Sequence, residues 1–192
     1  ATTLNDANDL TVTLATSGTT SLTADGDLTL DGVVSGATSD LTTTAAATIF
    51  GATTVGQNLS VTATGAVSDT GKLDVTGTTG ISAAGQTVTL DDAANDFIGA
   101  VTVTGGTTTL KDANDLTVTL TTSGATALTA GGDLTLDGTV SGATSDLTTT
   151  AAVTTFGATT VGQNLSVTAT GAVIDTGKLD VTGTTGISAA GQ

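Results

Sequence analysis

A long tandem repeat is the feature that most restricts the fold of this chain. The stretch that starts at Leu4 returns at Leu110, at an offset of 106 residues, and residues 1–86 differ from residues 107–192 at ten aligned positions. Near-identical tandem copies indicate one architecture that is extended by stacking, because each unit buries its apolar side chains against the next. We therefore expect residues 1–106 to form a first long unit of about five coils. Residues 107–192 then form a second, truncated copy of the same unit, in one continuous solenoid.

A finer period lies inside the long unit. Short pieces alternate Leu or Val with a polar residue, as in 10–14, 28–30, 59–61, 73–75 and 88–90, and Val33-Val34 is a further piece. This alternation is the period of two of a strand with one buried face. We count fifteen such pieces in one unit, or roughly one every seven residues, separated by turn formers such as Asp31-Gly32 and Gly56-Gln57-Asn58. No stretch has a helical apolar stripe, and Thr, Val and Gly disfavour helix. The pattern predicts an all-β chain.

The spacing of the pieces favours a parallel β-helix (β-solenoid) with three short strands per coil of about 21 residues. The alternative is a two-strand coil of about 15 residues. Stacking at about 4.8 Å per coil would make a rod about 43 Å long with a narrow aliphatic core. The expected coil starts are Leu10, Val33, Thr53, Leu73, Phe97 and Leu116.

Neither end of the sequence shows an amphipathic helix or a polar terminal coil, and a solenoid needs such caps to cover its open strand edges. We therefore expect a solenoid that is uncapped at both ends. This indicates a segment of a longer array or, alternatively, chains that stack end to end into a fibre.

Composition excludes several classes of function. The chain has no His and no Cys, so Ser-His and Cys-His nucleophile pairs and zinc sites of the usual kind cannot form. We expect no enzyme, no catalytic residues, no cofactor-binding residues and no metal-binding residues. The 18 acids, all of them Asp, face only 3 Lys, for a net charge of -15, which opposes nucleic-acid binding. No apolar run is long enough for a membrane span, and no signal segment is seen at the start.

Calcium is the one cofactor that the acids leave open, because it prefers several oxygen ligands. The main interpretation of the Asp clusters is that they form Asx turns and solubilising corners, since Asp25 is replaced by Gly131 in the second copy. The clusters are Asp6 and Asp9; Asp25, Asp27 and Asp31; and Asp91, Asp92 and Asp96.

Pairs of Thr two residues apart are the second candidate site. With Leu and Val inward, their hydroxyls point outward, and Thr is a favoured polar residue on an exposed strand face. A flat rank of Thr could bind ice or another crystal, but the expected coils place these pairs on different faces. The pairs are Thr11/Thr13, Thr62/Thr64, Thr87/Thr89, Thr102/Thr104 and Thr117/Thr119.

The remaining candidates have structural interpretations. Lys72 and Lys178 lie two residues before Asp74 and Asp180 and are expected to form surface ion pairs that contribute little stability. The three aromatic residues are expected to fill the core or the corners rather than to form a sugar-binding platform. They are Phe50, Phe97 and Phe156.

Several runs in the chain resemble the repeat region of filamentous haemagglutinin-type exoproteins and related giant bacterial adhesins. These runs are NDLTVTL, GDLTLDG, QNLSVTATGAV and KLDVTGTTG. The resemblance implies a right-handed parallel β-helix that forms the shaft of a secreted or bacterial cell-surface protein.

We therefore expect a non-catalytic structural shaft segment of an adhesin or an extracellular filament. Its partner is expected to be itself, through coil-on-coil stacking with the rest of the array or with neighbouring subunits, and no receptor or ligand can be named. The alternative is a solenoid that binds glycan, ice or mineral through an outward Thr or Asp face.

Overall fold

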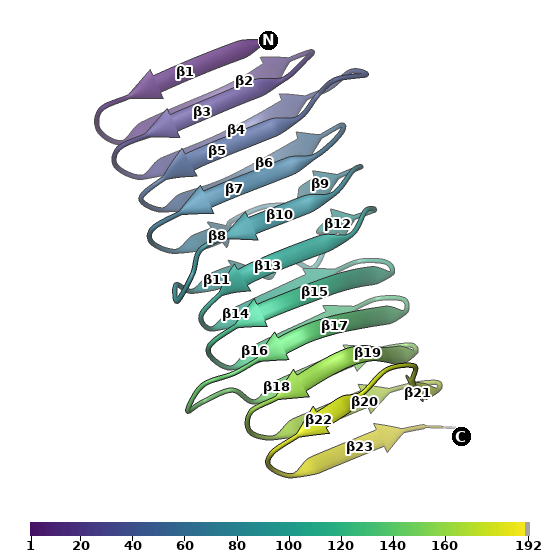
Figure 1. The fold of residues 1–192 in the computed structure, drawn as a ribbon. Coiled ribbons are helices and arrows are strands. Elements are labelled where there is room, and N and C mark those ends of the chain that lie inside the picture. The colour runs from purple at the N-terminus through teal and green to yellow at the C-terminus, as the bar shows by residue number, and fades with distance from the viewer. Residues whose placement is uncertain (191–192) are drawn as a thin grey trace.

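The computed structural model describes residues 1–190 and contains only strands, turns and loops over that range. Every strand pairing is parallel. The separation in sequence between paired residues ranges from 17 residues, for Val101 and Val118, to 22 residues, for Thr79 and Val101. The chain makes about nine coils of about 20 residues, which confirms the predicted β-solenoid. In Figure 1 the nearer strands run leftward and the farther strands return while the chain descends, which is a right-handed path.

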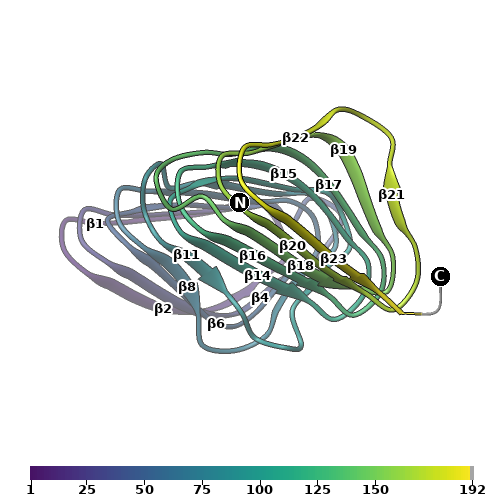
Figure 2. The same ribbon diagram turned by 90° about the horizontal axis from the view of Figure 1, so that it is seen from below.

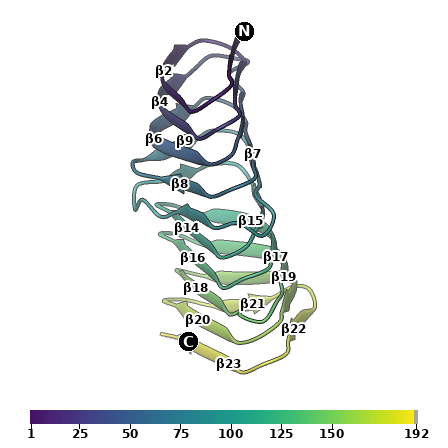
Figure 3. The ribbon, with the colours of Figure 1, turned by 90° about the vertical axis from the view of Figure 1, so that its left-hand side faces the viewer.

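Two sheets form opposite sides of the stack (Figures 2 and 3). The first sheet contains β1 (Thr2–Asp6), β3 (Thr20–Ala24), β5 (Leu41–Ala45), β7 (Leu59–Ala63), β10 (Thr79–Ser82), β13 (Val101–Gly105), β15 (Leu116–Thr122), β17 (Leu134–Val140), β19 (Thr154–Val161), β21 (Val173–Asp175) and β22 (Leu179–Val181). The second sheet contains β2 (Leu10–Thr16), β4 (Leu28–Val34), β6 (Thr48–Val55), β8 (Val67–Asp69), β9 (Leu73–Val75), β11 (Val88–Leu90), β12 (Asp96–Phe97), β14 (Thr108–Asp112), β16 (Thr126–Ala130), β18 (Leu147–Ala151), β20 (Leu165–Ala169) and β23 (Thr185–Ala189).

The expected three strands per coil occur only in part of the stack. The coil of β7, β8 and β9, the next coil of β10, β11 and β12, and the coil of β20, β21 and β22 have three, whereas most coils have two. In β4 the predicted pieces 28–30 and 33–34 form one strand, whose register to β6 shifts between Leu30 and Gly32. Gly32 has φ +112°, and a Cβ there would collide with the backbone of Leu14 in the preceding coil. Gly32 thus lets one long strand bend where a corner was expected.

The core is the narrow space between the sheets. Inward Leu and Val side chains lie above one another, as in the buried column Leu28, Thr48 and Val67. Phe50, Phe97 and Phe156 are completely buried, which confirms their predicted place in the core.

The long repeat does not contain a whole number of coils. Five coil-to-coil steps on the first sheet lead from Thr2 to Val101, and seven residues later Thr108, the equivalent of Thr2, lies on the second sheet. Leu116, expected to start a coil after Phe97, accordingly lies on the opposite sheet from Phe97. The 106-residue unit therefore takes five and a half coils rather than about five. Each copy is turned half a revolution from the one before it.

Candidate functional site

Outward hydroxyl groups form two columns on the first sheet. One column consists of Ser21, Thr42, Ser60, Gly80, Thr102 and Thr119, in which Gly80 is the one member without a hydroxyl group. The other column is Thr23, Thr44, Thr62, Ser82, Thr104 and Thr121. We call these two columns, which cross six consecutive coils, the first hydroxyl face.

The structure places the Thr pairs considered in the sequence on both sheets. Thr11 and Thr13 do lie on the opposite sheet from Thr102 and Thr104, as expected. Nevertheless, other Thr and Ser residues fill the same columns, so a regular rank forms. Register between coils depends on the lengths of the corners and not on the strand motifs, so these columns could not be predicted from the Thr pairs alone.

Charge is absent from the strands that carry this face. The sequences of β3, β5, β7, β10, β13 and β15 contain no Asp and no Lys, all within the described part of the chain. On the other side of the same coils, β4, β8, β9 and β12 contribute Asp31, Asp69, Asp74 and Asp96. One side of the stack is therefore neutral and the other acidic, in a chain with a net charge of -15.

The half-turn of the repeat reverses this distribution in the second copy. There the uncharged strands β16, β18, β20 and β23 belong to the second sheet, whereas Asp137, Asp175 and Asp180 lie on the first. The second hydroxyl face consists of Thr129, Thr148, Thr150, Ser166, Thr168 and Ser188, with Ala127 and Gly186 in the columns. The chain thus presents neutral faces on two opposite sides, over six strands of the first sheet and four of the second.

A shallow hollow of about 250 Å³ interrupts the first hydroxyl face. It lies at Gly80, where the column lacks a side chain, while the neighbouring side chains of Val61 and Ile81 are buried in the core. Hydroxyl-bearing residues, including Ser60 and Thr102, surround it. A Cβ on Gly80 would have only the carbonyl oxygen of Leu59 near it, at 4.0 Å, so the hollow has room for another group.

Acidic side chains at the corners hold one coil to the next. Asp40 Oδ1 accepts hydrogen bonds from the backbone N and Nδ2 of Asn58, at 3.1 and 2.9 Å, and Asn58 Oδ1 accepts from the backbone N of Thr78, at 2.9 Å. Asp146 and Asn164 repeat these contacts in the second copy. These side chains satisfy corner N–H groups that no strand ladder reaches.

Four of the acids considered for calcium, Asp6, Asp9, Asp27 and Asp92, act in the same way or as Asx turns. Asp9 Oδ1 accepts from Asp27 N, and Asp27 Oδ1 accepts from Ala47 N. Asp92 accepts from Ala94 N two residues later, as predicted for an Asx turn. No group of three or more carboxylates arranged to hold a metal ion occurs within residues 1–190.

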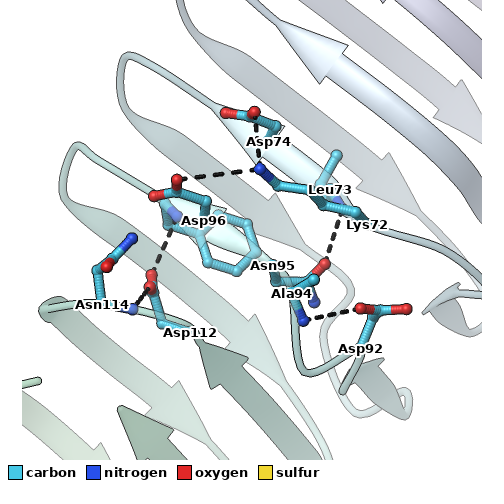
Figure 4. A network of polar contacts seen from close by, with 10 residues as sticks. Lys72, Leu73, Asp74, Asp92, Ala94, Asn95, Asp96, Asp112 and Asn114 are labelled. Atoms are coloured by element: carbon cyan, nitrogen blue, oxygen red, sulfur yellow. Dashed lines mark hydrogen bonds and ion pairs between the residues drawn. The ribbon is translucent and has the colours of Figure 1, made fainter. Parts of the chain in front are cut away.

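A polar network centred on Asn95, which the sequence did not single out, supports the irregular segment around residues 91–97 (Figure 4). Asn95 is completely buried; its Oδ1 accepts from Leu73 N at 2.7 Å, and its Nδ2 donates to Asp69 Oδ2 at 2.6 Å. Asp69 also accepts from the backbone N atoms of Asp91 and Asp92. Asn95 therefore replaces backbone pairing where β12 is only two residues long.

Lys72 lies between two stacked acids. Asp74 and Asp96 are register partners on adjacent coils, and like charges placed so are destabilising. Lys72 Nζ is 3.0 Å from Asp74 Oδ2 and 4.0 Å from Asp96 Oδ2, and the hydrogen bond to Asp74 raises the pKa of the lysine. In the second copy Lys178 pairs with Asp180 at 2.8 Å in a more exposed position.

Asp112 is the most buried acid of the network. Burial raises the pKa of its carboxyl group, although the backbone N–H groups of Asn114 and Phe97 donate to it at 2.8 and 3.0 Å and act in the opposite direction. The carboxyl group is thus a coil-to-coil acceptor that is costly to ionise. This role of Asp112 could have been inferred from the sequence only if the register between coils had been known.

Comparison with known families identifies the repeat. Residues 38–104 and 144–192, together more than half of the chain, match the family described as repeats of unknown function (DUF5649). The chain belongs to this family. No match was found among curated proteins or among solved structures. The match supports a repeat protein, and it does not confirm the more specific resemblance to filamentous haemagglutinin-type repeats.

The two DUF5649 segments start at equivalent residues, Thr38 and Thr144, 106 residues apart. Each begins just before a strand of a hydroxyl face, β5 on the first sheet and β18 on the second. The DUF5649 unit in this chain therefore carries its hydroxyl strands to alternate sides of the solenoid. Over residues 1–190 the structure has no helix of the length and apolarity that a membrane crossing requires.

Proposed function

We propose that the DUF5649 repeats of this chain form a structural shaft segment. The observation that carries this proposal is the uninterrupted pairing where one copy passes into the next: β13 pairs with β15 and β11 with β14 in the same parallel manner as strands within a copy. A further copy can therefore continue both sheets without a change in geometry. Array length would then set the length of the shaft.

We further propose that the shaft belongs to a bacterial adhesin or filament outside the cell or on its surface, with other coils of the array as its partner. The resemblance of its strand motifs to adhesin repeats supports this location. The proposed role is non-catalytic and needs no cofactor, since coil stacking and corner hydrogen bonds supply its stability. The net charge of -15 would keep parallel shafts apart.

The test is to measure length against copy number. At about 4.8 Å per coil, each 106-residue copy should add about 26 Å to the maximum dimension in small-angle scattering, at constant cross-section. A particle that grows in all dimensions would contradict the shaft. For the location, protease added to intact cells should remove the repeats without lysis, and protection of the repeats would contradict it.

The hydroxyl faces favour a second function, the binding of a neutral polysaccharide. Ordered hydroxyls without nearby charge can both donate to and accept from sugar hydroxyls, and the missing side chain at Gly80 leaves room for part of a sugar ring. The hollow and the mixture of Ser with Thr make the face less regular than a crystal surface such as ice requires. Depletion of the chain by an insoluble neutral glucan, but not by its carboxymethyl derivative, would support this function. Equal depletion by both would contradict it.

A further inference from the structure

The half-turn of the repeat places neutral surfaces on two opposite sides of one chain, six strands wide on the first sheet and four strands wide on the second. We infer that this chain is a two-sided cross-linker, which binds one neutral polysaccharide chain on each hydroxyl face and bridges them. This inference rests on the second proposed function and adds the number and direction of the binding surfaces.

The register fixes the geometry of the two faces. Thr42 and Thr62 project from β5 and β7 on the first sheet, and their equivalents Thr148 and Thr168 project from β18 and β20 on the second. All four side chains are exposed. Equivalent points are five and a half coils apart, or about 26 Å along the axis. A single polymer strand therefore cannot follow both faces without passing round the shaft.

The charge distribution determines which partner suits the faces. A polyanion is repelled by a chain of net charge -15, and a polycation would bind the acidic sides, where Asp31 and Asp137 lie. The hydroxyl faces carry no charge in their strands apart from Lys111 and Asp112 in β14, at the edge of the second face. A neutral, hydroxyl-rich polymer is the partner that gains hydrogen bonds there without losing ion hydration.

Self-association is the competing use of a neutral face, because two acidic shafts could meet there. One face spans six coils, about 29 Å, and its five-residue strands are about 17 Å long, so the shared surface is about 500 Å² per partner. This is below the roughly 800 Å² per partner of a standard stable interface. We therefore assign the faces to a polysaccharide.

The repeat supplies matched variants for the test. Thr42→Lys with Thr62→Lys alters the first face, and Thr148→Lys with Thr168→Lys alters the second at equivalent positions. None of these four side chains makes a hydrogen bond in the structure. Unchanged thermal melting by circular dichroism establishes that each variant is folded.

The experiment uses dextran-coated microspheres and records two quantities, the amount of protein bound and the clustering of the spheres by light scattering. The parent chain should bind and cluster them. Each single-face variant should retain about half of the bound protein and lose at least ten-fold in clustering, and the four-substitution variant should lose both. Clustering by the single-face variants at the parent level would overturn the inference.

The other outcomes separate the two proposals. Binding of the parent chain without clustering would overturn bridging and leave polysaccharide binding intact, whereas no binding would overturn both. Sedimentation of the parent chain as dimers or larger species without dextran, abolished by the same substitutions, would show that the faces join copies of this chain. Thermal hysteresis in place of dextran binding would assign the faces to ice.

Discussion

We expect two buried threonines to lower the stability of the solenoid. Thr43 is completely buried between its register partners Leu22 and Val61, and Thr149 occupies the equivalent position between Leu128 and Val167. The Oγ1 atom of each has no hydrogen-bond partner. Replacement by Val keeps the shape, removes a desolvated hydroxyl that costs about 1–3 kcal/mol, and adds a methyl group worth about 0.8 kcal/mol.

We expect each of Thr43→Val and Thr149→Val to raise the free energy of unfolding by about 2 kcal/mol. The two sites are about 26 Å apart along the axis, so the double variant should gain about 4 kcal/mol. Urea unfolding followed by circular dichroism measures the change, and a constant slope with urea shows that cooperativity is unaltered.

The neighbouring exposed Thr42 provides the control, because Thr42→Val should change stability by no more than about 0.5 kcal/mol. If the buried and exposed substitutions have equal effects, or if the double variant is less stable than the parent, the reasoning about unpaired hydroxyls is refuted.

Three further predictions concern the polar network and the strand bend. Asn95→Ala should destabilise by about 3 kcal/mol in urea unfolding, because it leaves the buried N–H of Leu73 unpaired; no measurable loss would contradict this role. The raised pKa of Asp112 favours its protonated form in the folded state, so its contribution to stability is greatest below the unfolded value of about 3.9 and is lost as pH rises through the folded value. The free energy of unfolding of the parent chain should therefore fall relative to that of Asp112→Asn as pH rises over that range. A difference between the two proteins that does not change with pH would contradict this prediction. Gly32→Ala should cost about 2 kcal/mol or more, since φ is +112° and the backbone of Leu14 occupies the space of a Cβ; an unchanged urea midpoint would count against this.

Local pattern was sufficient to predict the strands. The pieces at 59–61, 73–75 and 88–90 were predicted from alternating Leu or Val with polar residues, and each lies within a strand of the structure. The alternation of apolar and polar residues in a strand involves only residues that are adjacent in the chain, so it can be recognised in a single sequence. The fusion of 28–30 with 33–34 was missed because Asp31-Gly32 has the composition of a turn in either case.

The arrangement of faces could not be predicted in the same way. Coil lengths vary from 17 to 22 residues, and these differences add up along the chain until they decide on which sheet Leu116 lies. The hydroxyl columns and the burial of Asn95 depend on these accumulated differences in coil length, and no local motif predicts them. The corner acids were predicted as turn residues, but the coil that each one contacts requires the register.

The central claim is that the second copy continues the first with a half-turn, which makes Thr102 and Thr119 neighbours on adjacent strands of one sheet. The chain has no native cysteine, so pyrene attached at Thr102→Cys and Thr119→Cys reports on this pair alone. Strands of one sheet are about 4.8 Å apart, so the account predicts strong excimer emission. Monomer emission alone from the folded, doubly labelled chain would place the two residues on different sides and contradict the account.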